Sequence, residues 1–251
     1  MFKPHVHIPY GRITEHLPLL RANRLNLEIY FPSSSLDTVK SCDIAGLAGM
    51  LDYQPSISIH APFMDLSPGA VDSKVRAVTI ERFQQVFHIS ASLRPKIIVF
   101  HSGFEKWKYS LNVDIWLEES LRTWRQLLPA AEKTGTKIAI ENIFEDEPSS
   151  LKLLMQEMDS DSFGVCFDAG HCNLFSTVPL AAWINQLKPY IIELHLHDNS
   201  READAHKPVG EGTFDFDTLF SMLKDKDLLY TIEAHSAGDV LKNIEALKKY
   251  L

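Results

Sequence analysis

The sequence predicts an α/β fold, a single (β/α)8 barrel that takes in residues 1–251 as one domain. Three observations favour it. Short apolar runs alternate along the chain with segments long enough for a helix, which is the pattern of a parallel sheet. The runs are apolar throughout rather than alternating, as expected of strands that are buried on both faces. The length of 251 residues is close to the roughly 250 that eight strand–helix units need.

The eight strands are predicted, in order, from these runs. The first two are His5–Ile8 and Leu25–Tyr30. The other six each end on a residue that can bind a metal, and they are Ser56–His60, Ile97–His101, Ile138–Glu141, Val165–Asp168, Ile191–His195 and Tyr230–Glu233. Because parallel strands bring their carboxyl ends to one face of a barrel, these terminal side chains are expected to converge at one mouth.

Helices are predicted between the strands, and Asp72 and Asn112 stand where N-caps are expected. The predicted ranges are Ile13–Ala22, Leu36–Leu51, Asp72–Leu93, Val113–Lys133, Ser149–Met158, Pro179–Leu187, Phe216–Lys224 and Ala237–Tyr250. The fallback is a doubly wound open sheet. It lacks support because no glycine-rich phosphate loop follows the first strand.

Charge and cysteine content narrow the class of protein. The net charge of −8 argues against nucleic acid or an anionic membrane as the partner. Cys42, Cys166 and Cys172 form an odd set without framework spacing, which favours a reduced, cytoplasmic protein. The segment Met1–His5 lacks an apolar signal core, and no apolar stretch reaches the roughly 18 residues of a membrane span.

Further candidate metal ligands lie close to the strand ends. His171 follows Asp168 by three residues, and Asp204 and His206 stand two apart. His195 and His197 share one face of an extended strand, because side chains alternate along it. Carboxylates with imidazoles, and no thiolate, suit Zn, Mn or Mg.

On these motifs the chain resembles the xylose-isomerase-like TIM barrel superfamily. This group pairs isomerases and epimerases of sugars and sugar phosphates with AP endonuclease family 2, the endonuclease IV-like enzymes that act on abasic DNA. The resemblance extends from about Leu25 to Glu233. The motifs are His60-Ala61-Pro62, His101-Ser102-Gly103, Glu141-Asn142, Asp168-Ala169-Gly170-His171, His195-Leu196-His197-Asp198, Asp204-Ala205-His206, Gly210-Glu211-Gly212 and Glu233.

The resemblance implies a divalent metal cofactor, Zn or Mn, at one to three ions per chain. In the endonuclease branch nine residues hold three zinc ions, and the matching positions are His60, His101, Glu141, Asp168, His171, His195, Asp204, His206 and Glu233. In the isomerase branch four residues hold one ion, and the matching positions are Glu141, Asp168, His195 and Glu233. Because the nine contain the four, the ligands leave both branches open.

The surroundings of these motifs favour the isomerase branch. Endonuclease relatives carry a basic segment after the second strand that enters the DNA, whereas Phe31–Leu36 contains no Lys or Arg. Glu28 resembles the second-strand glutamate of isomerase-like proteins. The predicted activity is therefore a sugar or sugar phosphate isomerase or epimerase, in which Glu141 and Glu233 are both ligands and the acid–base pair. The alternatives are an endonuclease IV-like phosphodiesterase and a non-catalytic metal- or sugar-binding barrel.

The expected partner is a small sugar or sugar phosphate, and four residues are assigned to its binding. They are Glu28, Trp107, Arg201 and Lys207. Trp107 would stack on the substrate, with a lid packed on its own loop as the alternative. Arg201 and Lys207 would hold a phosphate, with solvated surface charges as the alternative. The sequence leaves the substrate, the metal and the oligomeric state open.

Overall fold

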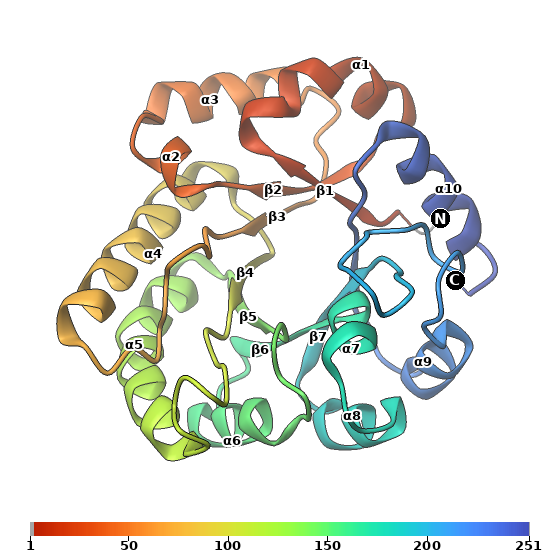
Figure 1. Cartoon of the computed structure of the whole chain (residues 1–251). Helices are drawn as coiled ribbons and strands as arrows, with labels where there is room; N and C mark the ends of the chain where they lie inside the picture. Colours follow the sequence, from red (N-terminus) through yellow and green to blue (C-terminus); the bar gives the residue numbers. More distant parts are fainter. Residues whose placement is uncertain (1–2, 251) are drawn as a thin grey trace.

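The protein folds as a closed barrel of eight parallel strands that follow one another around the barrel in sequence order, with the helices outside (Figure 1). The computed structural model describes residues 3–250. The strands are β1 (His5–Pro9), β2 (Asn26–Tyr30), β3 (Ile57–His60), β4 (Ile97–His101), β5 (Lys137–Glu141), β6 (Phe163–Asp168), β7 (Ile191–Leu196) and β8 (Leu229–Ile232). The predicted (β/α)8 fold is confirmed.

The helices form the outer layer of the barrel. They are the 3-10 turn η1 (Tyr10–Arg12) and the helices α1 (Ile13–Asn23), α2 (Ser33–Leu36), α3 (Ser41–Met50), α4 (Ser73–Leu93), α5 (Val113–Thr134), α6 (Ser149–Met158), α7 (Ala169–Phe175), α8 (Leu180–Leu187), α9 (Phe216–Leu223) and α10 (Ala237–Leu247). The predicted caps are confirmed, because Asp72 accepts the N–H groups of Lys74 and Val75, and Asn112 accepts that of Asp114.

Two helical regions differ from the prediction. The predicted helix Leu36–Leu51 is interrupted, because Lys40 is extended and its N–H is accepted by the Asp43 carboxylate at 2.8 Å, which starts α3. Helix α7 was not predicted. It is only 7 residues long and is started by the side chain of Asp168, which accepts the His171 N–H at 2.5 Å.

The strand pairs differ in how many residues they align. β1 and β8 align two residue pairs, and so do β3 and β4. Each of the other six neighbouring pairs aligns four or five. The barrel therefore has two short joints, one where the ends of the chain meet and one between β3 and β4.

The inside of the barrel is charged at the mouth. Beyond it, the side formed by β4, β5 and β6 is apolar, whereas the opposite side holds two hydrogen-bonded pairs, His5 with Ser58 and Thr231 with Glu193. Ile97, Val99, Ala139 and Cys166 form a small apolar cluster of their own. Because side chains two apart on a strand share a face, this cluster lies on the same inner face as the residues that end β4, β5 and β6. The larger core lies between strands and helices, where Trp124 stacks on Phe83 at 5.6 Å.

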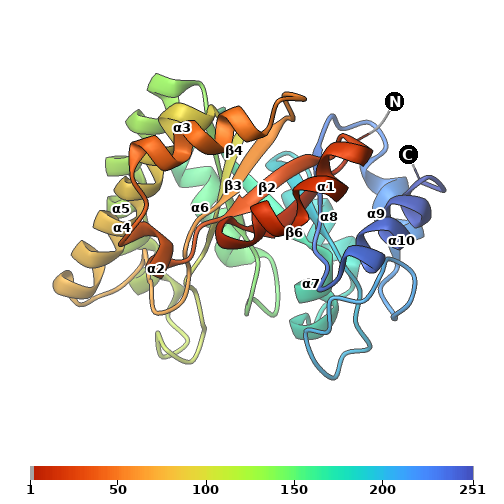
Figure 2. The same ribbon diagram turned by 90° about the horizontal axis from the view of Figure 1, so that it is seen from above.

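Long loops project together from one end of the barrel, as the turned view shows (Figure 2). The two ends of the described chain lie near each other beside α10 in both views (Figures 1 and 2). Within residues 3–250, none of the helices combines the length and apolar content needed to cross a membrane. The expected lack of a signal core rests partly on Met1 and Phe2, which lie outside the described residues.

Candidate metal centre

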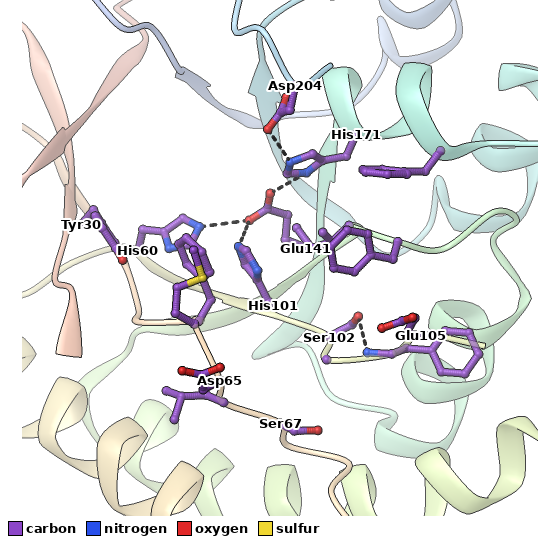
Figure 3. Close-up of a pocket in the computed structure, with 18 of the residues that line it drawn as sticks. Tyr30, His60, Asp65, Ser67, His101, Ser102, Glu105, Glu141, His171 and Asp204 are labelled. Atoms are coloured by element: carbon purple, nitrogen blue, oxygen red, sulfur yellow. Dashed lines mark hydrogen bonds and ion pairs between the residues drawn. The ribbon is translucent and has the colours of Figure 1, made fainter. Parts of the chain in front are cut away.

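Glu141, the last residue of β5, lies at the centre of the converging strand ends (Figure 3). Its Oε2 is 3.1 Å from Nε2 of His60 and 3.4 Å from Nε2 of His101. Its Oε1 is 3.1 Å from Nδ1 of His171. The carboxylate is almost fully buried, so both oxygens are committed to these imidazoles. One side chain thereby links the ends of β3 and β4 with helix α7.

A second group of side chains surrounds Nδ1 of His195. This nitrogen lies 3.2 Å from Glu233 Oε1, 3.6 Å from Glu141 Oε1 and 3.8 Å from Asp168 Oδ2. It is buried and has no hydrogen-bond partner. The other ring nitrogen, Nε2, lies 3.3 Å from the buried carboxylate of Glu28 and donates to it. Nδ1 of His195 is therefore buried among three carboxylates, a position where a cation would fit.

A third group lies further out, on the long loop after β7 and on α7. Asp204 Oδ2 is 3.4 Å from Nε2 of His171 and 3.1 Å from Nε2 of His206. His206 also brings Nδ1 to 3.6 Å from Glu233 Oε2, which joins this outer group to the inner one. Asp204 and His206 are partly exposed, whereas Glu233 is buried.

The loop that carries the outer group is shaped by Asp198. Its buried carboxylate accepts backbone N–H groups from Asn199, Gly210, Gly212, Thr213 and Phe214 at 2.8–3.2 Å. A Cβ on Gly212 would lie 2.3 Å from the Asp198 carboxylate, so only glycine allows this close approach. The Gly210-Glu211-Gly212 motif thus serves to fold the loop back on the strand end.

Fixed acceptors set the tautomers of two further imidazoles. His60 donates from Nδ1 to the Ala61 carbonyl at 2.8 Å, and His171 donates from Nδ1 to the Asn142 carbonyl at 3.1 Å. Each bond makes Nε2 the nitrogen through which a neutral ring would bind a metal, facing Glu141 in one case and Asp204 in the other. A carbonyl behind a histidine ring is the usual partner of a metal-ligating imidazole.

The buried histidines and carboxylates of the centre shift one another's pKa values. Burial alone would raise the pKa of Glu141 and of Glu233, but His195 and its neighbours outweigh burial and hold both pKa values well below the ordinary one. Burial would lower the pKa of His195, yet the surrounding carboxylates raise it. Burial dominates at His101 and lowers its pKa to about 3, so this ring is neutral. Divalent cations bind such sites by displacing protons from the imidazoles.

The residues present fit a divalent metal. Ligand atoms of His60, His101 and Glu141 lie within 4.8 Å of one another, as do those of His60, His195 and Glu233. The donors are nitrogen and oxygen only, which suits Zn or Mn. The ligands predicted from the sequence are thus brought together in three groups, and Nδ1 of His195, buried among three carboxylates, lies where a cation would fit.

A cavity of about 830 Å³ opens over this centre. Its floor includes Glu141, Glu233 and the imidazoles, and a wall is aromatic: the Phe63 ring stacks on His101 with centroids 4.1 Å apart. Asp65 and Glu105 also line the cavity (Figure 3). Lys108 is the only Lys or Arg among the described residues that line the cavity, and its Nζ donates to Ser67 Oγ at 3.0 Å.

The four residues assigned from the sequence to substrate binding do not line this cavity. Trp107 is 69% exposed outside it. Arg201 donates from Nε to Asn173 Oδ1 at 3.1 Å, and Lys207 donates from Nζ to Ser200 Oγ at 2.7 Å. Glu28 lies inside the barrel against His195. Glu28 thus contacts the His195 imidazole and is placed to orient it. Trp107, Arg201 and Lys207 have no contact with the cavity that would support their assignment to substrate binding.

Two histidines at the centre were not assigned as ligands from the sequence. His7 on β1 places Nδ1 3.0 Å from Glu28 and 3.3 Å from Glu233. His197 lies just beyond β7, with Nε2 3.1 Å from Asp168 Oδ2. The alternation of His195 and His197 was visible in the sequence, but the depth at which the second ring enters the centre was not.

Comparison with known proteins agrees with the barrel fold described above. The family model described as "Xylose isomerase-like TIM barrel" matches residues 30–250. The uncharacterized protein MJ1311 of Methanocaldococcus jannaschii is 31% identical over 210 residues, covering 79% of this chain and 71% of its own length.

Two solved structures with sequence identity above 25% share the whole fold. A D-tagatose 3-epimerase-like protein is 27% identical with a TM-score of 0.81, covering 99% of this chain and 97% of its own. The TTHB071 protein of Thermus thermophilus, soaked with zinc chloride, is 26% identical with a TM-score of 0.83, covering 99% of this chain and 98% of its own.

Proposed function

The chain belongs to the xylose isomerase-like TIM barrel family, and on that basis we propose that it is a divalent-metal-dependent isomerase or epimerase of a sugar. One observation carries the proposal. The carboxylates of Glu141 and Glu233 both approach Nδ1 of His195, at 3.6 and 3.2 Å, on the floor of the large cavity. Two carboxylates beside a position where a cation would fit can act as the general acid and the general base that move a proton at a carbon next to a carbonyl.

The proposed chemistry divides the work between ion and protein. A divalent ion at this point would polarise the carbonyl and offset the negative charge of the enediolate. Glu141 or Glu233 takes the proton from the substrate carbon, and a carboxyl group returns a proton to the same or the neighbouring carbon. Glu28 holds the His195 ring in place from behind at 3.3 Å.

The charges around the cavity favour a neutral sugar over a phosphorylated one. Phosphate binding generally uses several positive groups or backbone N–H groups. Lys108 is already hydrogen-bonded to Ser67, and two carboxylates, Asp65 and Glu105, also line the cavity. The aromatic ring of Phe63 lines the cavity and would present apolar surface to the C–H groups of a sugar. A ketose without phosphate is therefore the proposed substrate class.

Phosphodiester hydrolysis of abasic DNA is the second candidate. The observation in its favour is the outer group of His171, Asp204 and His206, which goes beyond the four residues that an isomerase needs. The near absence of Lys and Arg from the described cavity lining opposes it, because DNA binding depends on cationic side chains.

The test is metal-dependent exchange of solvent deuterium into a panel of ketoses, followed by mass spectrometry. Exchange is expected with added Zn or Mn, and is expected to disappear in Glu141→Gln and Glu233→Gln. The control is Glu81→Gln, since Glu81 is exposed on α4. Incision of an abasic duplex at a useful rate, with no exchange into any sugar, would reverse the ranking of the two candidates.

A further inference from the structure

His197 is a fully buried histidine that lies between the inner and the outer group. Its Nε2 is 3.1 Å from Asp168 Oδ2, on the inner side. Its Nδ1 is 3.6 Å from Asp204 Oδ1, on the outer side, and has no hydrogen-bond partner. Its ring stacks on that of His206 with centroids 4.0 Å apart. The side chain therefore reaches both groups through different nitrogens.

The tautomer of His197 follows from its inner contact. Asp168 Oδ2 is a carboxylate oxygen and can only accept, so Nε2 of His197 donates to it. Nδ1 then carries a lone pair, and that lone pair faces the carboxylate of Asp204. Two acceptors turned towards each other, without a donor between them, are unfavourable where water is excluded. A cation between them removes the conflict.

We propose that His197 is a ligand, through Nδ1, of a metal ion bound by the outer group. The full ligand set is then His171, Asp204, His206 and His197. Four protein ligands close a tetrahedral zinc site, whereas catalytic zinc sites keep a position open for water. The outer ion is accordingly structural: it fastens the loop after β7 and helix α7 to the barrel and generates no hydroxide.

The backbone beside His197 is built to admit the ring. A Cβ on Gly170 would lie 2.0 Å from Cε1 and 2.3 Å from Nδ1 of His197, so any larger residue at this position would displace the imidazole. Ligand atoms of Asp168, His171 and His197 lie within 4.8 Å of one another, and so do those of His197, His206 and Glu233. His197 is therefore within reach of both His171 and His206.

The test uses the zinc-loaded wild-type protein and an anomalous-scattering map. The expected result is an ion whose distance to Nδ1 of His197 is about 2.0–2.1 Å. In His197→Asn, elemental analysis after dialysis is expected to show about one ion per chain fewer, or an outer-site affinity lower by about tenfold or more. In His197→Cys loaded with cobalt(II), a thiolate-to-cobalt charge-transfer band is expected, because it requires direct contact.

The matched control is His235→Ala. The His235 ring is exposed and stacks on His206 at 4.8 Å, so its loss should leave metal content unchanged. An outer ion that carries water in place of His197, or no outer ion in the wild type, would overturn the assignment. The inference rests on the metal groups of the proposed function but not on sugar chemistry. If His197 binds the metal and no deuterium exchange into a sugar is found, only the proposed sugar reaction is rejected.

Discussion

At the scale of single residues, Glu145 is a buried carboxyl that the metal groups do not use. It accepts a hydrogen bond from Ser102 Oγ and, at 2.7 Å, from the N–H of Ile143. Burial dominates and raises the pKa of Glu145 from 4.5 to about 7. The folded protein therefore holds a proton here that the unfolded chain releases between these pH values.

This difference predicts a pH dependence of stability. Where the folded state binds more protons than the unfolded state, stability falls as pH rises. The contribution of Glu145 is fully present below pH 4.5 and is lost as pH rises through about 7. Since each pH unit is worth about 1.4 kcal/mol, the loss is about 3 kcal/mol. Glu145→Gln keeps the shape of the side chain without its ionisation, so the variant should gain that much relative to wild type.

The measurement is urea unfolding of both proteins from below the lower of these two pKa values to above the higher one, with a chelator present. A difference in unfolding free energy that does not change over this range would contradict the assignment. Glu147→Gln, on the neighbouring surface segment, serves as the control, because Glu147 is only partly buried.

The candidate ligands were accessible from sequence because each follows a local rule. Glu141, Asp168 and His195 end apolar runs, and parallel strands must bring such ends together. His197 and Glu28 follow the same alternation, but their roles depend on which nitrogen or oxygen faces which neighbour across the barrel. The same limit applies to side chains on loops, whose direction no strand or helix dictates. The identity of the residues at the centre was therefore more predictable than the contacts that their side chains make.

At the scale of elements, α7 joins the outer and inner groups through its first turn. Gly170 lies in that turn, against the ring of His197. Gly170→Ala should destabilise the protein by about 1–3 kcal/mol, as overpacking of a buried site usually does. It should also weaken binding of the outer ion, because the imidazole must move.

Gly46→Ala in α3 is the matched control for this prediction. No atom lies within 4 Å of the position a Cβ would take there. Alanine in a helix interior should stabilise by about 0.5–1 kcal/mol. Both changes are measured by urea unfolding, and zinc titration follows the ion. Equal behaviour of the two variants would contradict the role given to Gly170.

Elements with a long repeating pattern were predicted well, and short ones were not. The limits of α4 and α5 follow from their caps and from apolar residues at helical spacing. Helix α7 has too few residues to show any period, and it exists because the Asp168 carboxylate caps it. The break before α3 depends on one side-chain bond, in which the Asp43 carboxylate accepts the N–H of Lys40. Periodicity cannot reveal such local contacts.

At the scale of the whole molecule, the net charge of −8 predicts weak binding to duplex DNA. Each phosphate contact needs a cation and makes affinity fall steeply with salt. At about 150 mM salt we expect a dissociation constant no tighter than about 10⁻⁴ M for an abasic duplex, measured by fluorescence anisotropy. Micromolar binding with a steep salt dependence would instead support the phosphodiesterase.

Metal removal is predicted to lower the stability of the whole barrel. An ion that binds the folded chain but not the unfolded one stabilises it by about 2.7 kcal/mol when its concentration is about a hundred times the dissociation constant. Zinc or manganese should therefore raise the unfolding midpoint in proportion to the number of ions bound, and EDTA should reverse the effect. Sodium chloride at the same ionic strength controls for charge screening. An unchanged midpoint would mean that the groups do not bind metal in the folded state.

The two short joints of the barrel imply that ions bound at the metal centre would also hold the barrel closed. His60 and His101 end β3 and β4, which align only two residue pairs, and both rings meet on Glu141. His7 and Glu233 stand on either side of the joint between β1 and β8, which is equally short. Ions at the centre would link the two strands of each joint, where the fewest residue pairs are aligned. Without these ions the barrel would open first at the two joints. Amide hydrogens beside β3 and β8 would then exchange with solvent, while those of the strands from β5 to β7 stayed protected.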